Sequence, residues 1–245
     1  MTTLTLRALE LSLLFIKEQL KEPIALFWII ISPAVIYYLI SYSGRNAIHP
    51  GISYLENTSW FHAYISSSVA FFGFSFYIIG RRESGFIRSF IYTPEAKLIF
   101  LLAQFIAYSL ISLIYCAIFY ALTYFPFGPF DIYEFLTIIS RFYTCYLLFS
   151  VPGILLTLLP INFQNASTIF SIASFAMLAL GILSTREPHA IIDLINTFNP
   201  LYIANTIMSR GFENYEIMLS ILISFVIAFL LLLHFLRINP VWSRY

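Results

Sequence analysis

The charged residues of this chain gather in one short stretch, residues 80–97, with the sequence GRRESGFIRSFIYTPEAK. It holds three arginines, one lysine and two glutamates, although only 10% of all residues are charged. Thr93-Pro94 ends the expected helix of this stretch, because the residue before a proline avoids the helical region. Such a segment is suited to docking against another protein, and a plain positively charged topology anchor is the alternative. Its apolar residues share one face at helical spacing: Phe86, Ile87, Phe90 and Ile91.

Catalytic chemistry is not indicated in this chain. Gly80 and Gly85 have the separation of the two glycines of a P-loop, but Phe86 stands where its lysine is required. The sequence contains no HExxH or GxSxG motif, and its two cysteines and four histidines show no metal-ligand spacing. We therefore expect no enzyme activity, no catalytic residue, no metal and no cofactor in the chain itself.

The composition is typical of an integral membrane protein. Of the 245 residues, 60% are hydrophobic, and the mean hydropathy is +0.86. A soluble core of this size cannot hide so much apolar surface, so most of the surface is expected to face lipid. The formal net charge of +1 gives no reason to expect nucleic-acid binding.

The fold class expected from the sequence is all-α and integral to the membrane. About 20 apolar residues cross a bilayer as a helix, and six runs satisfy this length. No linker of low complexity separates them, so we expect one transmembrane domain over residues 1–245. The predicted spans are 24–42, 60–80, 98–125, 136–160, 164–184 and 215–236.

The lysines and arginines in the loops and near the ends of the spans predict the orientation, because they favour the cytoplasmic side. With six spans both termini and the 80–97 stretch share one side. Nine basic residues fall on that side and four on the other, which predicts cytoplasmic termini. The nine are Arg7, Lys17, Lys21, Arg81, Arg82, Arg88, Lys97, Arg237 and Arg244, and the four are Arg45, Arg141, Arg186 and Arg210.

The N-terminal residues 1–22 predict an amphipathic elbow helix, with Pro23 breaking it from the first span. Such a helix would lie in the cytoplasmic interface in contact with membrane lipid. A solvated or partner-facing helix is the alternative. Its charged residues occupy a narrow arc of the helical wheel: Arg7, Glu10, Lys17, Glu18 and Lys21.

The outer residues 185–214 predict two short helices separated by Asn199-Pro200. Each apolar piece has about ten residues and is too short to span. We expect these helices to dip into the outer leaflet or to cover an exit, and loop helices that pack on the spans are the alternative.

Residues 82–94 also resemble a known element. Arg82-Glu83-x-Gly85, followed eight residues after the glycine by Thr93-Pro94, is similar to the motif of type-2 ABC exporter permeases. The resemblance implies that residues 81–97 form a coupling helix that enters a cleft of a separate ATPase subunit. The residues that would form this ATPase-coupling interface are Arg81, Arg82, Glu83, Gly85, Phe86, Arg88, Phe90, Thr93 and Pro94, with charge from the arginines and Glu83 and docking anchors from the two phenylalanines.

The same resemblance implies the rest of the assembly. ATP and Mg²⁺ would bind in the partner ATPase, and a second permease copy, identical or a paralogue, would complete the path in a bacterial inner membrane. The substrate is expected to be amphipathic, such as a drug, a peptide or a lipid-like compound, and it would move out of the cytoplasm. Export of a lipid-linked polysaccharide, or a non-transporting anchor or assembly role, remains the alternative.

One helical face of the fifth predicted span carries small polar residues. Ser167, Ser171 and Ser174 recur there at helical spacing. Small residues let membrane helices approach closely, so close helix packing is one explanation for them. A lining of the substrate path is the other.

Overall fold

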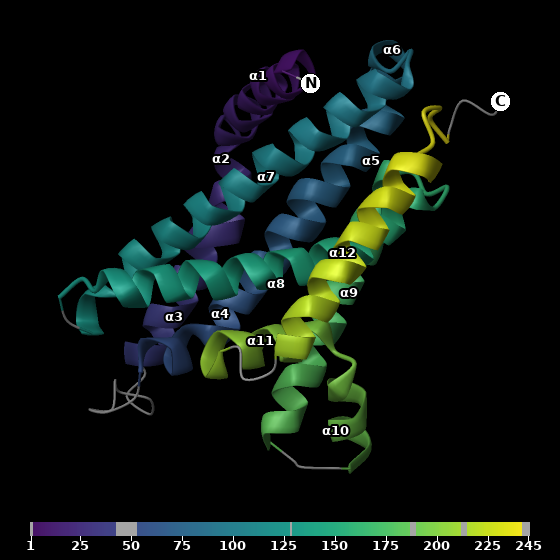
Figure 1. Cartoon of the computed structure of the whole chain (residues 1–245). Coiled ribbons are helices and arrows are strands. Elements are labelled where there is room, and N and C mark those ends of the chain that lie inside the picture. Colours follow the sequence, from purple (N-terminus) through teal and green to yellow (C-terminus); the bar gives the residue numbers. More distant parts are fainter. Residues whose placement is uncertain (1, 43–52, 128, 187–189, 212–214, 242–245) are drawn as a thin grey trace.

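The computed structural model describes residues 2–42, 53–127, 129–186, 190–211 and 215–241 (Figure 1). Five helical stretches in this part of the chain are long and apolar enough to cross a membrane. They support a multi-pass membrane protein built from helices. The five stretches are Tyr54–Glu83, Pro94–Thr123, Ile132–Leu158, Phe163–Leu183 and Tyr215–Phe235.

The five stretches correspond to seven helical elements. The first combines α4 (Tyr54–Ser68), the π-helical turn η2 (Val69–Ser75) and α5 (Phe76–Glu83). The others are α7 (Pro94–Thr123), α8 (Ile132–Leu158), α9 (Phe163–Arg186) and α12 (Tyr215–Phe235).

The predicted first span, 24–42, falls on three consecutive helical elements. They are α2 (Pro23–Leu26), η1 (Phe27–Ile31) and α3 (Ser32–Tyr42). Residues Phe27–Tyr42 are apolar but shorter than the five long stretches. The count of six spans therefore stays a prediction, while five spans have the length and composition to cross.

The long helices begin earlier than their apolar runs. Ser53 and Glu56 form a capping box, in which each residue bonds the backbone N–H of the other. The Thr93 hydroxyl accepts a hydrogen bond from Ala96 N at 3.1 Å, and the Asp131 carboxylate accepts one from Tyr133 N at 2.9 Å. These side chains satisfy the free N–H groups of the first turn, so each helix gains polar residues that hydropathy alone does not assign to it.

Small residues let the central helices of the core approach closely. A Cβ atom on Gly73 of η2 would lie 2.7 Å from the ring of Tyr108, and one on Gly153 of α8 would collide with the Ser75 hydroxyl. Around them the Phe71 ring contacts Phe149 and Phe170, with centroids 5.8 and 5.3 Å apart. This tight packing fixes η2 between α7, α8 and α9.

The two ends of the molecule differ in what they carry (Figure 1). Helix α1 (Thr2–Leu20), α6 (Phe86–Phe90) and the C-terminal segment lie at one end. Helices α10 (Ala190–Thr197) and α11 (Pro200–Arg210) lie at the other. The described parts of both termini thus share an end with the 80–97 stretch, which the orientation prediction requires. Of the residues used in that prediction, Arg45 and Arg244 lie outside the described residues.

Candidate coupling site

The charged stretch is a helix end, a turn and a short helix rather than one continuous amphipathic helix. Helix α5 continues to Glu83, and α6 covers Phe86–Phe90. Gly85 joins them with φ +78° and ψ 0°. This left-handed conformation is open to glycine and strained for most other residues. Helix α6 already ends at Phe90, ahead of the predicted stop at Thr93-Pro94, and Thr93 caps the start of α7.

Arg82 is buried, which corrects its expected role as a charge offered to a partner. Its side chain is 1% exposed. The guanidinium donates to the carbonyls of Thr157, at 2.9 Å, and Leu159, at 3.2 Å, and also to that of Ile161. These carbonyls belong to the C-terminal end of α8 and to the connection into α9, where helical hydrogen bonds run out. Arg82 therefore fastens the end of α5 to the α8–α9 connection.

Glu83 is the ion-pair partner of Arg82 and is buried with it. The Arg82 Nε donates to Glu83 Oε1 at 2.9 Å, and the Glu83 side chain is 8% exposed. Both carboxylate oxygens also accept from the backbone N–H of Val241, at 3.2 Å each. Glu83 thus holds the segment that follows α12. Like Arg82, it is an internal support and not a surface charge.

Arg81 connects the charged stretch to the elbow helix. Its Nη2 lies 2.5 Å from Glu18 Oε2 of α1, and its side chain is 11% exposed. The guanidinium also lies 4.1 Å from the centroid of the Phe15 ring and 5.0 Å from that of Phe86. Stacking of this kind adds to the ion pair. Helix α1, α5 and α6 therefore meet at one side chain.

Phe86 and Phe90, the expected docking anchors, are half-buried. Their rings stack at 5.7 Å with an interplanar angle of 10°. Both rings also pack against the Phe100 ring of α7, with ring centroids 6.3 and 6.5 Å apart. Phe15 of α1 contacts the same Phe100 ring at 6.0 Å. The two phenylalanines therefore hold α6 on α7.

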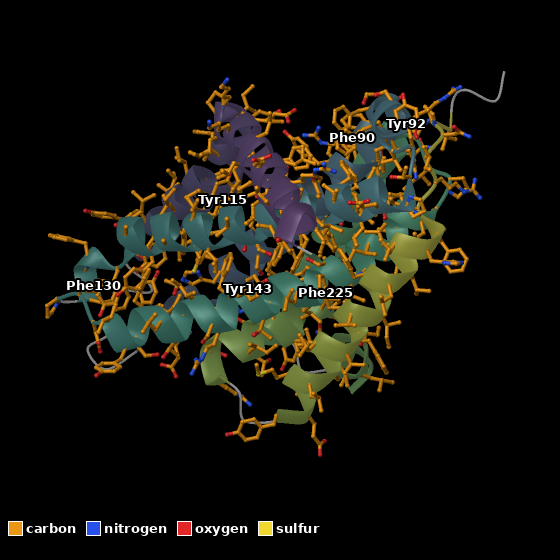
Figure 2. All side chains as sticks on the ribbon, turned by 45° about the horizontal axis from the view of Figure 1, so that its top comes forward. Phe90, Tyr92, Tyr115, Phe130, Tyr143 and Phe225 are labelled. Carbon is orange, nitrogen blue, oxygen red and sulfur yellow. The ribbon has the colours of Figure 1, made fainter. Side chains whose placement is uncertain are left out.

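The exposed tip of the site includes a residue that the sequence reasoning missed. Tyr92 is 81% exposed and lies beside Phe90 at one extremity of the molecule, opposite Phe130 (Figure 2). Large aromatic residues are common anchors of protein interfaces. Tyr92 stands in the sequence between α6 and the Thr93 cap of α7, and a large aromatic residue in a short connection could have indicated an exposed contact residue. Of the predicted interface residues, Arg88, Thr93 and Pro94 are exposed, and Ser84 and Ser89 are exposed with them.

The elbow helix α1 has three kinds of surface. A buried stripe of Ala8, Ser12, Phe15 and Gln19 faces the body of the protein, and the Tyr108 hydroxyl of α7 donates to Gln19 Oε1 at 2.8 Å. The predicted polar residues Arg7, Glu10, Lys17, Glu18 and Lys21 are all exposed. Exposed leucines, which suit contact with lipid, form the remainder: Leu6, Leu9, Leu13, Leu14 and Leu20.

The predicted path serines lie on a helix that the chain itself covers poorly. In the apolar stretch of α9, only 17% is buried inside this chain, whereas 50% of the corresponding stretch of α8 is buried. Ser171 is exposed, whereas Ser167 and Ser174 are half-buried. The face that carries Ser171 is therefore available to another helix or to a substrate.

The predicted outer segment 185–214 contains two short helices, as expected, and they pack on the spans. Asn199 accepts from Leu201 N at 3.0 Å, which caps α11, and its amide donates to the Met177 carbonyl of α9 at 2.9 Å. Arg141 of α8 donates to the Met208 carbonyl at 2.8 Å, near the other end of α11. Residues 187–189 and 212–214 of this segment lie outside the described residues.

The described part of the chain contains no cluster of three or more His, Cys, Asp or Glu side chains that would hold a metal ion. Cys116 and Cys145 are both buried as free thiols.

Comparison with known proteins reveals a similarity that covers most of the chain. No family model matches the chain. Over 243 residues the chain is 30% identical to protein McbE of Escherichia coli, across 96% of this chain and 98% of that protein. The similarity therefore extends far beyond the charged stretch.

Proposed function

This chain belongs to the family of Escherichia coli protein McbE, and within that family we propose that it is the membrane permease subunit of an ATP-driven exporter of the type-2 ABC class. A separate ATPase subunit would bind ATP and Mg²⁺ and would dock on the end that carries α6. The two termini would then lie in the cytoplasm of a bacterium, with the chain in the inner membrane.

The observation that carries this proposal is the contrast between the base and the tip of the coupling site. At the base, Arg82 and Glu83 are buried and bonded to the α8–α9 connection and to Val241. At the tip, Arg88 and Tyr92 are exposed. A tip that receives force from a partner needs a base that passes the force on to the spans, because packed elements move as rigid bodies. A plain topology anchor needs neither part.

The second permease copy would cover the face of α9 that this chain leaves open. Only 17% of the apolar stretch of α9 and 22% of that of α12 are buried inside this chain, so both helices keep large exposed apolar surfaces. The α9 face also carries Ser171, whose small side chain permits close helix approach. We propose that two copies, or a copy and a paralogue, meet along α9 and enclose a path for an amphipathic substrate.

Co-purification of an ATPase tests the proposal. The double variant Arg88→Glu with Tyr92→Ala changes exposed residues at the tip, so the fold should be retained. We expect the ATPase to accompany the unchanged protein in nanodiscs and to be lost from this variant. The matched control is Tyr215→Ala, because Tyr215 is also 81% exposed but begins α12 at the opposite end. An ATPase that is absent from both preparations, or that stays bound to the tip variant, would contradict the proposal.

The alternative of a non-transporting anchor makes a different prediction for the same experiment. An anchor would purify with a stable membrane partner that has no nucleotide-binding subunit, and the tip variant would not alter its composition. The alternative of lipid-linked polysaccharide export predicts the same ATPase, so the chemical class of the cargo decides it.

A further inference from the structure

A cavity of about 440 Å³ lies where the elbow helix meets the coupling site. Sites for small molecules in proteins commonly have volumes of about 300–1,000 Å³, so the cavity has room for a compound of drug size. Its walls come from the end of α1 and the residues just after it, from α5 and α6, and from the first turn of α9. The lining includes Glu18, Glu22, Phe76, Arg81, Phe86 and Phe163.

The apolar wall of the cavity is aromatic. The centroids of the Phe76 and Phe163 rings lie 4.2 Å apart. The Phe163 ring also packs closely against Gly80, since a Cβ atom at that position would lie only 3.2 Å from it. Phe86 contributes a ring from α6. Aromatic faces carry partial negative charge and attract organic cations.

The charges of the lining leave one carboxylate without a cation. Arg81 already lies 2.5 Å from Glu18 and stacks on Phe15 and Phe86. No lysine, arginine or histidine among the described residues lies within 4.0 Å of the Glu22 carboxylate. Glu22 stands before α2, is exposed, and makes no capping hydrogen bond. Its neighbour in the lining is the Tyr77 hydroxyl, a neutral hydrogen-bond partner that leaves the carboxylate charge uncompensated. The cavity therefore combines aromatic rings with a net negative charge.

We propose that this cavity binds an amphipathic organic cation, with the cationic group near Glu22 and the apolar body against Phe76, Phe86 and Phe163. The identification of this ligand as the exported cargo rests on the proposed function, whereas its binding does not. Because Glu18 and Arg81 line the same cavity, a bound cation competes with Arg81 for Glu18. Occupancy would thereby loosen the contact between the elbow helix and the coupling site.

Tetraphenylphosphonium is a suitable probe, because tetraphenylborate has the same shape and the opposite charge. Binding of each ion to the full chain in nanodiscs is measured by equilibrium dialysis, and binding to protein-free nanodiscs is subtracted. We expect saturable binding of the phosphonium and none of the borate. Equal binding of the two ions would overturn the proposal, because the cavity would then not select charge.

Two pairs of variants locate the binding. Glu22→Gln removes the unpaired charge, and Glu10→Gln is its control, since Glu10 lies exposed on α1 and does not line the cavity. Phe163→Ala removes one ring, and Phe175→Ala is its control on the exposed face of α9. We expect about tenfold weaker phosphonium binding for the first member of each pair, as for the loss of one charge contact, and unchanged binding for the controls. If Glu22→Gln and Glu10→Gln bind the probe equally well, the assignment is wrong.

The cation could belong to a soluble compound or to a lipid headgroup, and the lipid composition separates these sources. Weaker phosphonium binding in nanodiscs that contain phosphatidylethanolamine, compared with phosphatidylglycerol alone, would identify a headgroup ammonium as the competitor. Unchanged binding would identify a site for soluble cations. Both results support the site. Loss of the ATPase partner with retained phosphonium binding would contradict the proposed function alone, and the converse would contradict this inference alone.

Discussion

The Glu18 carboxylate of α1 and the Arg81 guanidinium of α5 meet at 2.5 Å, although 62 residues lie between them in the chain. One member belongs to the elbow helix and the other to the base of the coupling site. Arg81 is at the same time stacked on Phe15 and Phe86. The pair therefore joins the two elements that a docked ATPase would move together.

Breaking this pair should impair coupling more than stability. A partly exposed ion pair contributes about 0.2–1 kcal/mol to folding, so Arg81→Glu should shift the thermal midpoint little. We expect the ATPase activity of the assembled complex to lose its response to cargo. The charge-swapped variant, Glu18→Arg with Arg81→Glu, should recover part of that response. If the swap recovers nothing while each single variant is well folded, the pair is not the connection.

Arg82→Ala should destabilise the protein strongly. It removes the donor from three carbonyls at the α8–α9 connection and removes the guanidinium that forms an ion pair with the buried Glu83 carboxylate. Removal of one partner of a buried ion pair costs about 3–5 kcal/mol. Thermal unfolding in nanodiscs measures the loss, and Arg88→Ala is the control, because Arg88 is exposed on α6. Equal midpoints for the two variants would show that Arg82 does not support the base.

Gly85→Ala should strain the turn between α5 and α6 without any steric clash. A Cβ atom on Gly85 would meet nothing within 4 Å, but the φ of +78° disfavours an L-residue by about 1–2 kcal/mol. Gly85→Asn should be better tolerated, because asparagine visits this region more readily. The free energy of unfolding of the two variants checks the order. Alanine as stable as asparagine would contradict it.

The orientation can be read from single cysteines, since Cys116 and Cys145 are buried. Ser89→Cys places an exposed thiol on α6, and Tyr133→Cys places one at the opposite end, where Tyr133 is 79% exposed. A maleimide that does not cross membranes should label Ser89→Cys in inverted vesicles and Tyr133→Cys in right-side-out vesicles. The reverse pattern would place the termini outside and would rule out a cytoplasmic ATPase.

The sequence by itself determined the helical class and the approximate positions of five helices that are long and apolar enough to cross a membrane. Long apolar runs have one low-cost arrangement in lipid, because the helix satisfies all backbone groups internally. Helix starts and breaks were also readable from the sequence, because they depend on residues that are neighbours in the chain. Thr93-Pro94 marked the start of α7, and Asn199-Pro200 separated α10 from α11. The early start of α4 was also readable, since Ser53 and Glu56 have capping-box spacing.

Only the tertiary structure decided which charges of the 80–97 stretch are internal. Arg81, Arg82 and Arg88 look alike in the sequence, yet Arg82 is buried by the carbonyls of the α8–α9 connection, about 75 residues later. Arg81 is engaged by Glu18, and Arg88 remains exposed. Hydropathy and helical spacing describe one element at a time. The fate of a side chain depends on which distant groups pack against it, and those groups meet only when the helices assemble.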